Sequence, residues 1–190
     1  MPVYVYHVLA KYALVKPDGT LLDMPGYDKK LKVFYDPSDD LKDLDIPEYC
    51  SQEDAKDAAK VLQHLFAEFP FEGDADRANM IGLLLTPFIR HAFKGDIQLA
   101  LLDATNPGTG KTFLAQIAAI IATGARTEAR SQKGDGDEWR KFILAVLLKC
   151  PQIVLIDNVR GTLASVSLEA ALTSETISDR LLESVWLALS

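Results

Sequence analysis

The stretch Thr105-Asn106-Pro107-Gly108-Thr109-Gly110-Lys111-Thr112 decides how the rest of the chain is interpreted. It fits the phosphate-loop pattern, which begins with glycine and ends in Gly-Lys-Thr or Gly-Lys-Ser, except that Thr105 takes the place of the first glycine. Gly108 and Gly110 let the backbone turn tightly, so that successive amides can point toward anionic oxygens. The stretch therefore predicts a site for the phosphates of a nucleotide.

The runs on either side of this loop predict a strand before it and a helix after it. Ile97 to Asp103 is a short apolar run, too compact for a helix and typical of a buried parallel strand. Lys111 to Thr123 predicts a helix that ends at Gly124, a residue suited to the position after a helix. The positive end of that helix would add to the attraction for phosphate. A glycine-rich turn that binds nothing is the plain alternative, but the strand-loop-helix context favours the phosphate loop.

The predicted ligand of this loop is ATP with magnesium. In a phosphate loop the lysine, here Lys111, reaches the β- and γ-phosphates, and the hydroxyl of Thr112 ligates the metal. The predicted nucleotide-binding residues are Thr105, Asn106, Pro107, Gly108, Thr109, Gly110, Lys111, Thr112 and Phe113.

A second apolar run, Ile153 to Ile156, ends in Asp157. It predicts a buried strand that delivers a carboxylate at its C-terminal edge, where α/β sheets bind their ligands. Asp157 is predicted to hold the magnesium together with Thr112, directly or through water. A strand-ending aspartate in a surface turn is the alternative, and the spacing after a phosphate loop favours the metal role.

Asn158 follows, at the position where many ATP-hydrolysing motors carry a glutamate that polarises the attacking water. A carboxamide cannot accept a proton as a carboxylate does, so the general base stays unassigned. Glu169, Glu175 and Asp179 are candidates, but an exposed position on a helix or loop explains each of them better than catalysis does.

The N-terminal part of the chain predicts a small β-rich unit and a linker, residues 1–49. The turn Pro17-Asp18-Gly19 sits between two alternating runs and predicts a β-hairpin, and Leu31 to Tyr35 predicts a further strand. The Asp- and Pro-rich run from Asp36 to Tyr49 predicts a linker.

Residues 50–95 predict a helical segment that packs on the ATPase core. Ser51-Gln52-Glu53-Asp54 predicts a capping box at the start of a helix that Pro70 stops. A second helix is predicted from Asp74, bent or broken at Pro87.

From residue 96 to residue 190 predicted strands alternate with predicted helices. A helix beginning at Asp135 or Asp137 would present one apolar face made of Trp139, Phe142, Ile143, Val146 and Leu147. A short helix near Ser165 to Leu172 and a strand from Val185 to Leu189 complete the pattern. The fold class is therefore α/β, with a mostly parallel sheet flanked by helices.

The bulk composition narrows the partners and the compartment. The chain has 190 residues, a length that suits one large α/β domain or one domain with a small appendage. Of these residues 48% are hydrophobic and 25% charged, ordinary values for a soluble globular protein. The net charge of −7 argues against a broad basic face for duplex DNA. Cys50 and Cys150 lack metal-ligand spacing, and no apolar run is long enough for a membrane span. Because Met1-Pro2-Val3 does not begin a signal peptide, we expect a cytoplasmic protein that does not enter a membrane.

Several stretches together resemble one family, the helicase-like ATPase region of phage and mobile-element replication proteins, which is often joined to a primase domain. These stretches lie in the same order over roughly residues 12 to 190, and only the phosphate loop is specific by itself. They are Pro25-Gly26-Tyr27-Asp28, Phe69-Pro70-Phe71, Leu85-Thr86-Pro87-Phe88-Ile89-Arg90, Pro107-Gly108-Thr109-Gly110-Lys111-Thr112, Asp137-Glu138-Trp139-Arg140-Lys141, Leu155-Ile156-Asp157-Asn158-Val159 and Ser178-Asp179-Arg180.

The resemblance implies a P-loop NTPase core of the AAA+ or RecA-like kind, working as a homo-oligomeric ring on DNA, with a primase as an attached domain or partner. In such rings an arginine of one subunit stabilises charge on the γ-phosphate held by the next. Arg180 matches that position, with Arg160 and Arg140 as weaker candidates and a surface ion pair as the alternative. The Asp-Asn pair matches Asp157-Asn158. The predicted catalytic residues are thus Lys111, Asp157, Asn158 and Arg180.

The resemblance also implies that the core is C-terminally incomplete, because the sensor residue and the lid of related ATPases lie beyond a strand at which this sequence stops. Two other functions remain open. One is a protein-remodelling or loader ATPase with the same core, and the other is a nucleotide switch that does not hydrolyse, which Asn158 would suit.

Overall fold

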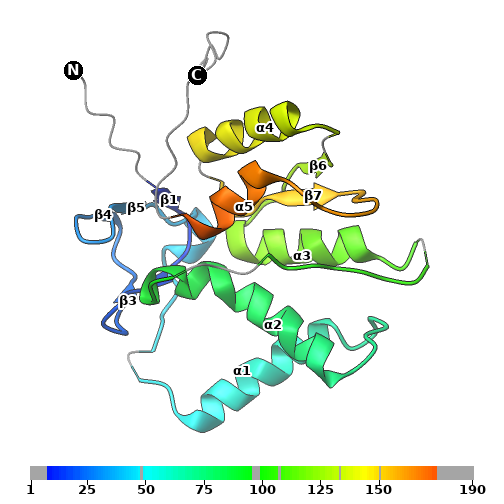
Figure 1. Cartoon of the computed structure of the whole chain (residues 1–190). Coiled ribbons are helices and arrows are strands. Elements are labelled where there is room, and N and C mark those ends of the chain that lie inside the picture. Colours follow the sequence, from blue (N-terminus) through cyan, green and yellow to red (C-terminus); the bar gives the residue numbers. More distant parts are fainter. Residues whose placement is uncertain are drawn as a thin grey trace, which may run out of the picture. The chain divides into compact units, whose positions relative to one another are not determined.

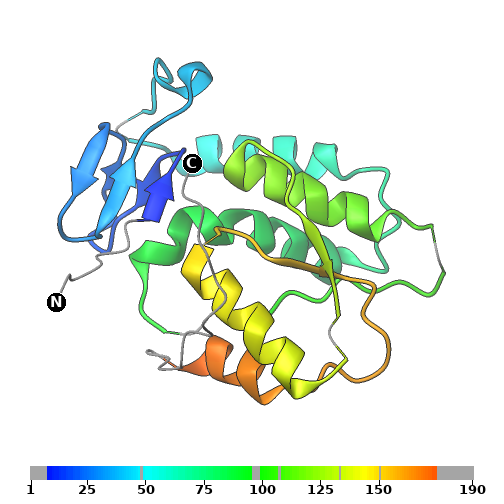
Figure 2. The ribbon, with the colours of Figure 1, turned by 90° about the horizontal axis from the view of Figure 1, so that it is seen from above.

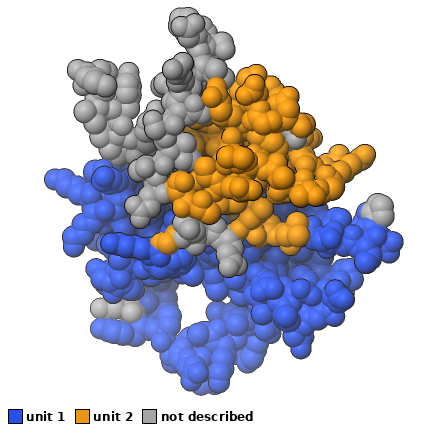
Figure 3. All heavy atoms as spheres, in the orientation of Figure 1, with its two compact units in different colours: residues 1–94, 102–127 blue, residues 95–101, 128–190 orange. Residues whose placement is uncertain are grey.

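The computed structural model describes residues 8–47, 49–95, 99–106, 108–132, 134–149 and 151–174. Within these residues the chain forms five α-helices and three small β-sheets, which places it in the mixed α/β class (Figure 1). The chain divides into two compact units (Figure 3). Unit 1 comprises Met1–Lys94 and Leu102–Thr127, and unit 2 comprises Gly95–Leu101 and Glu128–Ser190.

The N-terminal strands of unit 1 form a three-stranded sheet and a hairpin, drawn in blue in Figure 2. In the sheet β5 lies between β1, which is parallel to it, and β4, which is antiparallel. In the hairpin β2 pairs with β3, and the amide of Lys16 donates to the carbonyl of Thr20 at 2.8 Å. The predicted hairpin and the predicted strand near Leu31 to Tyr35 are confirmed. The strands are β1 (Val8–Ala10), β2 (Leu14–Val15), β3 (Leu21–Leu22), β4 (Gly26–Asp28) and β5 (Val33–Tyr35).

These strands enclose a small core of their own. Its buried residues are Ala10, Tyr12, Leu14, Leu22, Val33 and Tyr35. The ring of Phe88, from a helix later in the chain, packs on Tyr12 with the ring centroids 4.5 Å apart. The helical segment therefore contacts the N-terminal strands within unit 1.

The burial of Tyr12 makes the stability of this core depend on pH. Burial raises the pKa of Tyr12 to about 12, because ionisation would leave a charge in an apolar site. A raised pKa contributes stability that is fully present below the ordinary tyrosine value near 10 and is lost as the pH rises toward 12. We expect the unfolding free energy of the parent, measured in urea, to fall more between pH 9 and pH 11 than that of Tyr12→Phe, which has no phenol to ionise at this position. Identical pH slopes for the two proteins would contradict this assignment.

Helix α1 (Gln52–Leu65) begins at the predicted capping box. The hydroxyl of Ser51 accepts the amide of Asp54 at 3.1 Å, and the Asp54 carboxylate accepts the amide of Ser51 at 2.8 Å. The Ser51 hydroxyl also donates to that carboxylate, and these bonds lower the pKa of Asp54. Two amides that would have no partner in the helix are thereby satisfied.

Replacing Ser51 by alanine should cost about 1 kcal/mol of unfolding free energy, because the amide of Asp54 loses its acceptor. Thermal unfolding followed by circular dichroism measures this loss. Ser51→Asp, which keeps an acceptor at the same position, should retain most of the stability. Equal unfolding midpoints for Ser51→Ala and the parent would show that the cap contributes nothing.

Helices α2 (Asp74–Ile89) and α3 (Lys111–Thr123) pack side by side in unit 1 (Figures 1 and 2). Of the bend or break predicted at Pro87 the break is wrong, since α2 continues to Ile89 before a 3-10 turn, Arg90–Ala92. Because Pro87 lies in the last turn of α2, it removes only one hydrogen bond near the end of the helix. Beside it, the Thr86 hydroxyl donates to the Gly82 carbonyl at 2.7 Å. The two helices contribute to a second core cluster of unit 1, whose buried residues are Phe66, Met80, Leu84, Leu114 and Ala118.

Unit 2 contains a two-stranded parallel sheet, β6 (Ala129–Ser131) with β7 (Leu155–Asp157), and two helices. Helix α4 (Gly136–Lys149) begins at Asp135, whose carboxylate accepts the amide of Glu138 at 2.8 Å. Helix α5 (Val166–Thr173) begins at Ser165, as predicted within one residue. The buried core of the described part of the unit is Trp139, Phe142, Ile143 and Leu168, with Val146 packed against it. The predicted apolar face of α4 is therefore confirmed except at Leu147, which is 40% exposed.

Two of the predicted strands need correction. Over the described residues Leu99 to Asp103 no strand forms, and Leu101 is 78% exposed, so the predicted buried strand before the loop is wrong there. An extended segment becomes a strand only when a neighbour completes its hydrogen bonds, and none of the described residues pairs with this one. Strand β7 is half-buried and begins only at Leu155. The strand predicted from Val185 to Leu189 lies outside the described residues.

In the part of the chain that the structure describes, no helix combines the length and the apolar character that crossing a membrane requires. Cys50 is exposed and forms no disulfide, and Cys150 lies outside the described residues.

Candidate nucleotide-binding site

The predicted phosphate loop is a bent turn that leads directly into α3. Gly108 and Gly110 have φ angles of 80° and 88°, the left-handed region that side chains with a Cβ enter at a cost. The Thr109 hydroxyl donates to the carbonyl of Asn106 at 3.3 Å and closes the turn. The glycines therefore stand where the backbone requires them. Pro107 lies outside the described residues.

The N-terminal end of α3 differs from that of the other helices. The first turns of α1, α2, α4 and α5 each carry acidic residues, whereas the first turn of α3 carries none. Its N-cap, Gly110, makes no side-chain cap hydrogen bond. The positive end of the helix dipole is thus not neutralised by a local carboxylate, and Lys111 adds a full positive charge. This end of the helix suits an anion.

The ammonium of Lys111 lies 3.8 Å from a carboxylate oxygen of Asp103. The carboxylate is 83% exposed and the lysine side chain 40% exposed, so water screens the pair and it contributes little to stability. The pair holds the Lys111 side chain toward the segment that precedes the loop. A phosphate group with several negative oxygens would compete well with one exposed carboxylate for this ammonium.

The residues that would hold magnesium are oxygen donors on separate units. Thr112 is exposed on the first turn of α3 in unit 1, and Asp157 is half-buried at the end of β7 in unit 2. Among the described residues no cluster of three or more His, Cys, Asp or Glu could hold a metal by itself. This donor set fits magnesium that is held mainly by phosphates and water, with one or two protein oxygens. The predicted pairing of Thr112 with Asp157 across the ion stays a prediction.

Asp157 and Asn158 end β7 in a strained turn. Asn158 has a φ of 58°, and its backbone amide donates to the Asp157 carboxylate at 2.7 Å. Asparagine tolerates this left-handed conformation better than most residues with a side chain. The backbone thus offers a local reason for asparagine, where many motors carry glutamate.

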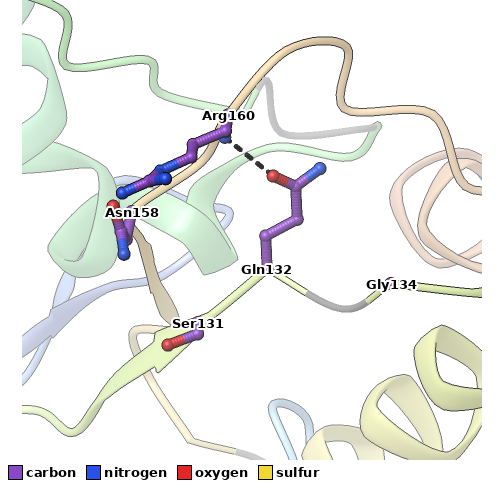
Figure 4. A pocket seen from close by; sticks show the side chains of 5 residues that line it. All are labelled: Ser131, Gln132, Gly134, Asn158 and Arg160. Carbon is purple, nitrogen blue, oxygen red and sulfur yellow. Dashed lines mark hydrogen bonds between the residues drawn. The ribbon is translucent and has the colours of Figure 1, made fainter.

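A hollow of about 350 Å³ lies at the carboxyl ends of β6 and β7 (Figure 4). The amide of Arg160 donates to the side-chain oxygen of Gln132 at 2.8 Å, which ties the two loops after the strands together. The described residues that line the hollow are all polar or glycine: Ser131, Gln132, Gly134, Asn158 and Arg160. Of the sequence-predicted residues, Asn158 and the weaker candidate Arg160 therefore meet at one edge of the sheet.

Arg180, Glu175 and Asp179 lie outside the described residues. Glu169 is exposed on α5. The general base therefore stays unassigned.

The contacts that three residues make were not predicted from the sequence. Gln132 follows a strand that is too short and polar to predict. The side chain of Gln116 on α3 makes two hydrogen bonds to the backbone of Thr127. Its amide nitrogen donates to the Thr127 carbonyl at 2.9 Å, and its amide oxygen accepts the Thr127 backbone amide at 3.1 Å. Phe69 lies against the loop, with one ring carbon 3.4 Å from where a Cβ on Gly110 would stand. For Phe69 the motif Phe-Pro-Phe was a visible signal.

The candidate site thus consists of the glycine turn, the N-terminal end of α3, whose first turn has no acidic residue, and Lys111 at the start of that helix. The family resemblance of the sequence stays a prediction. No protein-family model, no curated protein and no solved structure matches this chain.

Proposed function

We propose that the protein binds ATP at the loop 105–112 and hydrolyses its β–γ bond with water. The observation that supports this most is the left-handed turn at Gly108 and Gly110 opening into a helix whose first turn contains Lys111 and no acid. Backbone amides in such a turn, with a helix dipole behind them, bind phosphate oxygens. The proposal includes a P-loop core in which further parallel strands flank β7.

In this proposal Lys111 leaves Asp103 and binds the β- and γ-phosphates as a point charge. Thr112 and Asp157 would hold magnesium, which when bound neutralises charge on the phosphates. Asn158 can donate or accept a hydrogen bond and so orients water, but it does not take a proton from it. An arginine such as Arg180, supplied by a neighbouring subunit, would stabilise charge on the γ-phosphate.

The work that hydrolysis drives is proposed from the resemblance of the sequence to helicase-like replication ATPases. We propose unwinding of DNA or movement along it, by a homo-oligomeric ring in the replication of a phage or mobile element. A nucleotide switch without turnover is the second candidate, and the carboxamide of Asn158 is the observation that favours it.

Phosphate release from ATP by the full-length protein tests the proposal, measured with magnesium, with excess chelator and with single-stranded DNA. Turnover that needs magnesium and rises with DNA supports the motor. Turnover that ignores DNA supports a remodelling or loader ATPase. Tight binding of ATP without any release would instead establish the switch.

A further inference from the structure

Beside the phosphate loop, two phenylalanine rings stack on each other within unit 1. Phe113 is the first residue after Thr112, and Phe69 belongs to the segment between α1 and α2. Their ring centroids are 6.3 Å apart and their planes differ by 19°, within the range of offset stacking. Phe69 also reaches the loop itself, because a Cβ on Gly110 would lie 3.4 Å from its Cε1 atom. The pair thus borders the last glycine of the loop.

The exposure of Phe113 is what distinguishes it from a core residue. It is 56% exposed, whereas its neighbour Leu114 is 7% exposed and belongs to the core cluster with Phe66. Phe69 is half-buried and packs against that cluster, in edge contact with Phe66 at 6.0 Å. Phe113 therefore presents an aromatic ring to solvent. Its ring stacks on Phe69, which in turn packs against the core cluster.

The ligand chemistry that fits this surface follows from its place. A nucleoside triphosphate carries phosphates at one end and a flat heteroaromatic base at the other, joined by a ribose. If the loop and Lys111 hold the phosphates, the base needs an apolar face close to the start of α3. Aromatic side chains stack on any base, because every base has a π face.

We infer that Phe113 is the stacking surface for the base of the bound nucleotide, and that Phe69 is the positioning residue that fixes its ring. This inference rests on the proposed function, since it assigns the base subsite of the same nucleotide. Stacking on ring carbons offers no hydrogen bond to the edge of the base. The pair therefore supplies affinity for a base and little discrimination between adenine and guanine.

Calorimetric titration in the presence of magnesium tests the inference with two probes, ATP and ribose 5′-triphosphate, which lacks the base. The parent should prefer ATP by about tenfold or more, the usual effect of one base stacked on one aromatic ring. Phe113→Ala should lose that preference and bind both probes alike. Phe113→Leu, which keeps apolar bulk without a ring, should retain only part of it. Phe69→Leu should reduce the preference, and Phe69→Tyr should keep it.

Two control variants separate this inference from the proposed function. Phe34→Ala removes a phenylalanine of similar exposure, 44%, from the N-terminal sheet and should leave the preference for ATP unchanged. Lys111→Ala should weaken both probes together, because it removes a phosphate contact. An undiminished preference for ATP in Phe113→Ala overturns the stacking assignment while leaving the phosphate site standing. Failure of the parent to bind either probe would overturn both.

Discussion

Lys111→Ala should lower the rate of ATP hydrolysis by roughly a hundredfold or more, the scale seen when a group that stabilises developing charge is removed. The ammonium is the only full positive charge on the first turn of α3, and no acid on that turn opposes it. Its loss leaves the helix dipole and the loop amides to hold the phosphates alone. Phosphate release at saturating magnesium and ATP, on the full-length protein, measures the effect.

The fold should survive this substitution, because the pair with Asp103 is exposed and screened by water. Lys60→Ala is the matched control. Lys60 also lies in unit 1 and forms an exposed ion pair, with Asp57 at 2.6 Å, but on α1. It should release phosphate at the parent rate. Equal rates for Lys111→Ala and Lys60→Ala would remove the lysine from the mechanism.

Trp139→Ala should destabilise unit 2 by about 3–5 kcal/mol, a large part of the stability of a typical domain. The indole is 3% exposed and packs edge-on against Phe142, with the ring centroids 5.6 Å apart. Together with Ile143 and Leu168 it forms the core on which β7 and α5 pack. Removing it leaves a cavity that so small a core cannot close.

Urea unfolding followed by circular dichroism measures that loss. Trp139→Phe, which keeps most of the apolar area, should fall between Trp139→Ala and the parent. Lys141→Ala, on the same helix with an exposed side chain, should unfold at the parent midpoint. A midpoint for Trp139→Ala equal to that of Lys141→Ala would show that this cluster does not hold the unit together.

The elements that sequence predicted well are those set by a few neighbouring residues. The capping box at Ser51, the turn at Asp18-Gly19 and the end of α3 at Gly124 each depend on hydrogen bonds that span only a few positions. Gly124 has a φ of 74°, a conformation that glycine adopts without cost. Local chemistry of this kind is readable from the chain.

What sequence did not predict depends on distant partners. Strand β6 is three residues long and carries arginine and serine, so it has no apolar run to mark it, and only its pairing with β7 makes it a strand. The bond between Gln132 and Arg160 joins residues 28 positions apart. Likewise the contact of Phe69 with the loop exists only because α2 and α3 pack together.

For the candidate site the same division holds. The loop, its glycines and Lys111 were predicted because backbone turn and helix start are local. The turn at Asn158 was not, since no pattern in the sequence reports a left-handed φ at a residue with a side chain. Once that conformation is known, asparagine is explained by the backbone as well as by any role toward water.

The proposed nucleotide site depends on backbone amides of the loop 105–112 that would face phosphate oxygens, and NMR spectroscopy of the ¹⁵N-labelled protein observes such amides directly. On titration with magnesium and ATP, the largest amide shifts should fall on Gly108, Gly110 and Lys111. Gly19 and Gly26, which share the positive φ but lie in the N-terminal strands and their turns, should not move. Shifts that spare the loop, or that follow Gly19 and Gly26 instead, would contradict the assignment of a nucleotide to this chain.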